Sequence, residues 1–204
     1  MKDERVTHVT MVDIDQGLVK ACQKHLTMMH QGSFESSRLT LLFEDGGKFL
    51  QNANDETFDV IIVDGIDISE AYFSRAYGAA TYGNILFDSK FIRNVFRTLR
   101  QGGAFVEYMS QVDQGKYESS MRWAGFADTV YYCVDIESFY GTGACFSLSA
   151  KGQQKPLDAR LEIGLAKYRQ DSWLHLNAHV FTECRAGVGR KLKGGGGGGA
   201  GGAG

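Results

Sequence analysis

Five acidic residues follow three apolar runs of this 204-residue sequence, and their types and spacing are typical of a ligand-binding rim. Asp13 and Asp15 stand at the end of the first run, Asp45 follows the second, and Asp64 and Asp67 follow the third. Ligands of open parallel sheets bind beyond the carboxyl ends of the strands, so these carboxylates would meet there. Like charges brought together need a cation or hydrogen-bond donors to offset their repulsion. The pattern predicts a ligand that supplies positive charge and hydroxyl groups, as a nucleoside and a polyamine together would.

The three runs themselves are typical of buried strands. They cover residues 6–14 (VTHVTMVDI), 39–43 (LTLLF) and 58–63 (FDVIIV), and they are rich in apolar and β-branched residues. The third run is almost continuously apolar, which predicts a central strand covered by helices on both faces. We expect the first and third runs to lie buried and parallel, with Asp13 and Asp64 at the same edge of one sheet.

The elements between and after these runs predict an α/β fold. Apolar residues recur at helical spacing over 16–25 and 87–99, a short amphipathic stretch covers 48–52, and residues 104–108 form a further strand pattern. Strands that alternate with helices favour a parallel sheet with right-handed crossovers. Residues 128–135 and 144–149 predict an antiparallel edge pair. The fold class is therefore Rossmann-like α/β, mostly parallel with an antiparallel edge.

Simpler explanations compete at several acidic positions. For Asp15 and Asp88, the capping of a helix N-terminus is the better interpretation. For Asp45, which precedes Gly46 and Gly47, a tight turn alone explains the residues. The repetition of acidic residues after consecutive strands favours a nucleoside site. Many nucleotide-binding α/β folds share this pattern, so it does not identify the reaction.

Composition and charge exclude several functional classes. A net charge of −2 with basic residues spread along the chain gives no footprint for nucleic acid. No apolar run is long enough for a membrane span, and the N-terminus lacks the apolar stretch of a signal peptide. We expect a soluble, cytoplasmic protein without membrane or nucleic-acid partners. Neither cysteines nor histidines have the spacing of a metal site, so no metal is expected.

The chain divides into a core and a less regular C-terminal part. The periodic pattern ends near residue 151, shortly before Pro156, the only proline. Residues 1–151 are the expected Rossmann-like core, residues 152–193 an extension of uncertain structure, and residues 194–204 a flexible tail of glycine and alanine.

The acidic segments resemble the spermidine/spermine synthase family, the polyamine aminopropyltransferases. The segments are VTMVDID (9–15), RLTLLFEDGGKFL (38–50) and FDVIIVDGIDIS (58–69), and the resemblance continues to about residue 151. It implies a sheet of the S-adenosylmethionine-methyltransferase type. Asp13 matches the residue that holds the ribose of decarboxylated S-adenosylmethionine, and Asp45 with Gly46 matches the adenine contact. Asp64 matches the catalytic aspartate, and Asp67 matches the residue that binds the amine.

The sequence also departs from the family pattern. The family usually has glutamate where Asp13 stands, and its Gly-Pro-Ala gate is replaced by SEAYFSRAYGAAT at 69–81. Tyr140 lies one position from a tyrosine that packs on the amine chain in the family. The family's glycine-rich loop before the first strand, and an N-terminal β-region that helps to form the oligomer, have no counterpart before residue 6. The resemblance therefore implies a chain truncated at its N-terminus, and a homo-oligomer when that region is restored.

The function implied by the resemblance is polyamine biosynthesis. An aminopropyl group would pass from decarboxylated S-adenosylmethionine, acting as co-substrate, to an amine such as putrescine or spermidine. No tightly bound cofactor is expected. Two alternatives stay open, an S-adenosylmethionine-dependent methyltransferase of the same fold and a truncated, non-catalytic paralogue.

Overall fold

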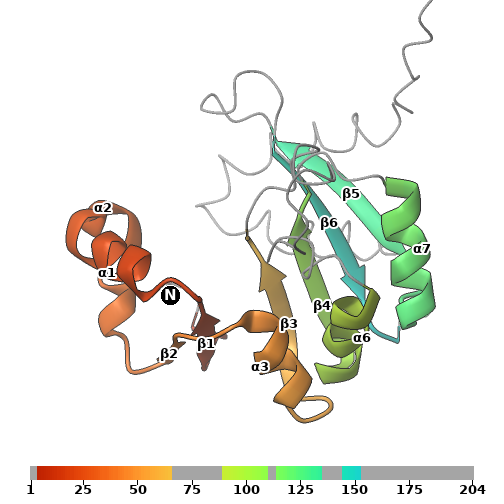
Figure 1. The fold of residues 1–204 in the computed structure, drawn as a ribbon, viewed down its shortest axis with the longest axis horizontal. Helices are drawn as coiled ribbons and strands as arrows, with labels where there is room; N and C mark the ends of the chain where they lie inside the picture. Colours follow the sequence, from red (N-terminus) through yellow and green to blue (C-terminus); the bar gives the residue numbers. More distant parts are fainter. Residues whose placement is uncertain (1–3, 66–88, 110–113, 135–143, 153–204) are drawn as a thin grey trace, which may run out of the picture.

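The computed structural model describes residues 4–65, 89–109, 114–134 and 144–152, which alternate between strands and helices (Figure 1). The elements up to residue 63 are β1 (Val9–Val12), α1 (Gln16–His25), α2 (Thr27–His30), the 3₁₀ turn η1 (Ser33–Glu35), β2 (Leu39–Leu42), α3 (Gly46–Asn52) and β3 (Phe58–Val63). The later ones are α6 (Ser89–Thr98), β4 (Leu99–Tyr108), α7 (Gln114–Ala124), β5 (Thr129–Val134) and β6 (Ala144–Ala150). The predicted site residues Asp67 and Tyr140, and residues 153–204, lie outside the described residues.

The first two strands form a parallel pair. β1 and β2 lie in register from Val9 opposite Leu39 to Val12 opposite Leu42. The chain crosses between them through α1, α2 and η1, as a parallel connection requires. All four residues of β1 are half-buried, so the predicted strand over 6–14 is shorter and more exposed than expected.

The other strands form a four-stranded sheet in the order β3-β4-β6-β5. β3 and β4 are parallel, whereas β6 runs antiparallel to both β4 and β5. This arrangement confirms a mixed α/β fold with the predicted antiparallel edge pair, and β3 with β4 supplies one parallel pair of this sheet. Gly103 permits the close approach of β3 and β4, because a Cβ there would lie 3.0 Å from the Asp59 carbonyl oxygen.

One hydrophobic core lies between this sheet and the helices α3, α6 and α7. The helix α6 contributes most of its apolar face, and Ile92, Val95 and the adjoining Leu99 are fully buried. Leu50 of α3 and Met121 of α7 belong to the same cluster. These three helices therefore cover the same face of the four-stranded sheet.

The expectation that β1 and β3 share one sheet is wrong. Among the described residues β1 pairs only with β2 and β3 pairs only with β4, and Figure 1 shows the two-stranded sheet set apart from the larger one. The described residues also cover only one face of β3. Ile61 and Val63 pack against the core, but Val60 is 54% exposed and Ile62 68% exposed. Successive side chains of a strand point to opposite faces, and the helices described above cover only one of them.

Candidate active site

Asp13 lies directly beyond the carboxyl end of β1. Its backbone N–H donates to the Leu42 carbonyl (3.1 Å), which continues the β1–β2 pairing by one residue. Its carboxylate Oδ1 accepts a 2.8 Å hydrogen bond from the N–H of Asp15. The side chain is half-buried, so its position is fixed at the strand end while part of it stays accessible to a ligand.

Asp15 has the capping role that the sequence favours. Its Oδ1 accepts a hydrogen bond from the N–H of Leu18 (2.9 Å), which satisfies one of the free N–H groups at the start of α1. Asp15 is therefore a structural residue in this rim.

Asp45 caps α3 in the same way. Its Oδ1 accepts hydrogen bonds from the N–H groups of Gly47 (2.8 Å) and Lys48 (3.1 Å). Next to it, no protein atom lies within 4 Å of where a Cβ would stand on Gly46. The capping bonds hold the carboxylate of Asp45 in place, and Gly46 presents backbone that a ligand can approach closely.

The structure brings part of the predicted site together. Asp13 and Asp45 follow paired parallel strands in register, so they belong to one rim at the carboxyl ends of β1 and β2. Asp64 follows β3 and is exposed at the carboxyl end of the other sheet. Within the described residues, these rims are not joined by strand pairing.

A buried carboxyl group on β4 was not expected from the sequence. Glu107 is fully buried, and its Oε2 accepts a 2.6 Å hydrogen bond from the Tyr117 hydroxyl, which also bonds Ser147 Oγ at 2.9 Å. Burial raises the pKa of Glu107 to about 8 from the ordinary 4.5, and the bond from Tyr117 opposes that rise in part. The only sequence signal is an acid at an inward position of a strand, two residues after the buried Phe105.

The cluster of Glu107, Tyr117 and Ser147 does not belong to the acidic rim. Glu107 points to the core face of the sheet with Phe105 and Met109. Asp64 lies two residues after the exposed Ile62 of the neighbouring strand, which places it on the opposite, exposed side. The described residues contain no group of three or more side chains that could hold a metal ion. None of the described helices is long and apolar enough to cross a membrane.

Comparison with known proteins agrees with the sequence patterns. Residues 1–155 match the family model of the spermine/spermidine synthase domain. A polyamine aminopropyltransferase of Ruegeria sp. (strain TM1040) is 32% identical over 145 residues, which cover 69% of this chain and 47% of that protein. The corresponding protein of Serratia proteamaculans is 29% identical over 172 residues, covering 82% of this chain and 55% of that protein. The chain thus spans about half the length of the curated relatives it matches.

Solved structures show the same fold. A spermidine synthase in complex with the transition-state analogue AdoDATO superposes with a TM-score of 0.61 at 20% identity, over 74% of this chain and 49% of that one. The spermidine synthase from Thermotoga maritima superposes with a TM-score of 0.58 at 19% identity, over 74% of this chain and 48% of that one. This likeness confirms the predicted fold class. With the family model matched over about three quarters of its length, the chain belongs to the spermine/spermidine synthase domain family.

Proposed function

We propose that this chain takes part in polyamine biosynthesis as an aminopropyltransferase. It would transfer the aminopropyl group of decarboxylated S-adenosylmethionine to an amine such as putrescine or spermidine. The observation that carries the proposal is the family match over residues 1–155. Within these residues Asp13 and Asp64 directly follow strands, and Asp45 lies at the start of the helix after β2. Both substrates are small molecules, no resident cofactor is needed, and we place the reaction in the cytoplasm.

The two ends of the nucleoside have separate partners in this proposal. Asp13 would accept hydrogen bonds from the ribose hydroxyls, since its Oδ2 is not used in the bond to Asp15. Asp45 would bind the adenine amino group while Gly46 allows the ring to approach the backbone. Each of these acids is held by the local bonds described above, so little ordering remains to be done when the ligand binds.

The transfer itself needs a neutral amine. Its nitrogen attacks the carbon next to the sulfonium, the new C–N bond forms as the C–S bond breaks, and methylthioadenosine leaves with the bonding electrons. The nitrogen must also shed a proton, and Asp64 would accept or relay it. Asp67 would hold the far end of the cationic chain and Tyr140 would pack on it, and positioning of the two substrates supplies much of the rate.

The proposal is tested by product analysis. The protein is incubated with decarboxylated S-adenosylmethionine and a panel of diamines and triamines, and release of methylthioadenosine is measured. Release that depends on an amine supports the proposal. Methyl transfer from S-adenosylmethionine instead would favour the methyltransferase alternative, and binding without any turnover would favour the non-catalytic paralogue.

A further inference from the structure

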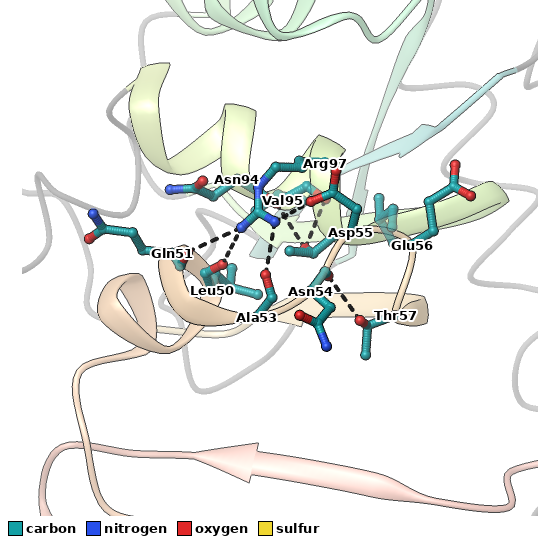
Figure 2. Close-up of polar contacts among 12 residues, drawn as sticks. Leu50, Gln51, Ala53, Asn54, Asp55, Glu56, Thr57, Asn94, Val95 and Arg97 are labelled. Carbon is teal, nitrogen blue, oxygen red and sulfur yellow. Dashed lines mark hydrogen bonds and ion pairs between the residues drawn. The ribbon is translucent and has the colours of Figure 1, made fainter.

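Arg97, near the C-terminal end of α6, holds the C-terminal end of α3 (Figure 2). Its Nη2 donates to the carbonyl oxygens of Leu50 (2.9 Å) and Gln51 (3.2 Å), and its Nη1 donates to that of Ala53 (2.8 Å). The same Nη1 forms an ion pair with the Asp55 carboxylate. One guanidinium thus binds three backbone carbonyls and a carboxylate at the end of a seven-residue helix.

These bonds have the chemistry of a helix cap supplied from another helix. The last carbonyl groups of a helix lack partners within it, and a cation there also offsets the negative end of the helix dipole. The planar fork of arginine can engage several acceptors at once, which the single ammonium of lysine cannot reproduce. Because the Asp55 side chain is 70% exposed, its ion pair contributes little, and the carbonyl bonds are the main part of the contact.

The position of α3 matters because it links two sheets that share no strand pairing among the described residues. It follows β2 directly, and Asp45 caps its N-terminus. On the other side, Leu50 is buried in the core and the Phe49 ring lies 6.0 Å from that of Phe58 on β3. The placement of α3 on the core therefore sets where Asp45 lies relative to Asp64.

The helix that carries Arg97 is itself firmly held. Phe91, Ile92 and Val95 of α6 are buried in the core. Thr57 on the segment after Asp55 donates through its N–H to the Thr98 carbonyl at 2.7 Å, so the chain between α3 and β3 is fixed to the same helix end. Arg97 therefore connects α3 to a helix that is anchored in the core.

We infer that Arg97 is a positioning residue for the nucleoside. It does not touch the substrate; it holds α3 so that Asp45 and Gly46 meet the adenine at the correct place relative to Asp64. The inference rests on the proposed function for the identity of the ligand, but it concerns a residue for which the family resemblance implies no role.

The test compares Arg97→Met and Arg97→Lys with the unchanged full chain. Dissociation constants for methylthioadenosine are measured by NMR titration, which also reports weak binding, and KM values are measured for the nucleoside and the amine. Arg97→Met is expected to weaken nucleoside binding about 10- to 100-fold, the size of effect that a small misplacement produces, with the KM for the amine unchanged. Arg97→Lys should recover part of this loss.

Lys151→Met is the matched control. Lys151 is buried, whereas Arg97 is half-buried. The Nζ of Lys151 binds the carbonyl oxygens of Leu99 (2.7 Å) and Arg97 (3.4 Å) and forms an ion pair with Glu56 (3.4 Å), but among the described residues it bonds none of α3. The Lys151→Met variant should lower the melting temperature, as Arg97→Met does, but should leave nucleoside binding unchanged. Equal weakening by both variants would show that Arg97 acts only through overall stability, and the inference would be overturned.

The outcomes separate this inference from the proposed function. If the unchanged chain binds methylthioadenosine but transfers no aminopropyl group, the proposed reaction is wrong, while selective weakening by Arg97→Met still supports the positioning role. If Arg97→Met leaves nucleoside binding unchanged, the inference is wrong whether or not the chain is active. If the unchanged chain does not bind the nucleoside at millimolar concentration, the positioning role is overturned with the site that it serves.

Discussion

The hydroxyl of Tyr117 on α7 donates a 2.6 Å hydrogen bond to the buried carboxyl group of Glu107 on β4. Glu107 lies opposite Ser147 on β6, and Ser147 lies opposite Tyr131 on β5, so polar side chains form a row across three strands. Within the described residues, Glu107 Oε1 and the Tyr131 hydroxyl have no hydrogen-bond partner. An incompletely paired carboxyl group inside the core makes stability depend on its protonation.

Stability should fall as the pH rises from about 4.5 to 8. Burial raises the pKa of Glu107 from 4.5 to about 8, so the folded state holds its proton more tightly than the unfolded state does. Its contribution is therefore fully present below the unfolded pKa and is lost as the pH rises through the folded pKa, by a few kcal/mol in all. Urea unfolding at a series of pH values measures this slope.

The variant Glu107→Gln isolates the contribution of Glu107 to that slope. Burial raises the pKa of both Tyr117 and Tyr131 above the ordinary value for tyrosine, so these phenols stay neutral throughout the range. Glutamine cannot titrate, and the decline in stability between pH 4.5 and 8 should largely disappear. The same decline in the variant and the unchanged protein would show that another group causes it.

Tyr117→Phe and Tyr131→Phe should have opposite consequences although each removes one hydroxyl. Loss of the Tyr117 hydroxyl leaves Glu107 and Ser147 without their shared partner and should cost about 1–3 kcal/mol of unfolding free energy. The Tyr131 hydroxyl has no hydrogen-bond partner in the described part of the chain, so its removal should be neutral or stabilising. Thermal and urea unfolding at pH 6 measure the stability of both variants against the unchanged protein. A larger loss for Tyr131→Phe would contradict the hydrogen-bond arrangement described above.

Substitutions of Gly46 should separate folding from binding. No protein atom crowds a Cβ at this position, and alanine is the better helix former, so Gly46→Ala should stabilise the protein by about 0.4–1 kcal/mol. Gly46→Leu should also fold but should block the adenine by occupying its space. Melting temperatures and methylthioadenosine titrations measure both effects. Unchanged nucleoside binding by Gly46→Leu would place the adenine elsewhere.

Asp64→Asn and Asp67→Asn should differ in their kinetics. Asp64→Asn removes the proposed proton acceptor and should lower turnover by about 10²–10⁴ with little change in nucleoside binding. Asp67→Asn weakens the hold on a distant ammonium group and should mainly raise the KM for the amine, by a cost of about 1–3 kcal/mol. Steady-state kinetics with varied amine at saturating nucleoside distinguish them. Near-normal turnover of Asp64→Asn would remove its catalytic role.

Nucleoside binding by this chain alone should be weak. Asp13 and Asp45 each use Oδ1 in hydrogen bonds to backbone N–H groups, so fewer acceptor sites of each carboxylate remain for the nucleoside. We expect a dissociation constant of about 0.1 mM or weaker for methylthioadenosine, measured by calorimetry. Micromolar affinity would show that further groups of this chain bind the nucleoside.

Local patterns predicted the elements better than their assembly. The run 58–63 became β3, and residues 128–135 and 144–149 became an antiparallel pair close to the expected bounds. The separation of β1 from β3 was not predicted, because an apolar run has the same sequence whether helices cover one face of the strand or both. Strand pairing depends on which other strands are present, and periodicity does not contain that information.

The same limit applies to the site. The capping role of Asp15 was predicted because its acceptor lies three residues from the donor. Asp45, for which the sequence suggested a tight turn, also caps a helix. The contact of Arg97 with Leu50 joins residues 47 apart, and that of Tyr117 with Ser147 joins residues 30 apart. Such contacts follow from the packing of whole elements, so no spacing in the sequence indicates them.

The exposed face of β3, with Val60 and Ile62, gives the described part of the molecule a surface that favours aggregation. The four residues of β3 from Val60 to Val63 are all β-branched and apolar, and one edge of this strand has no partner strand among the described residues. Asp59 is the only charged residue of the strand, and it is held by Arg100 at 2.7 Å. That pair acts as a gatekeeper, since a charge beside an apolar strand disfavours the stacking of copies edge to edge. We therefore expect concentration, storage and refolding of the protein to depend on this strand as well as on the residues that bind the nucleoside.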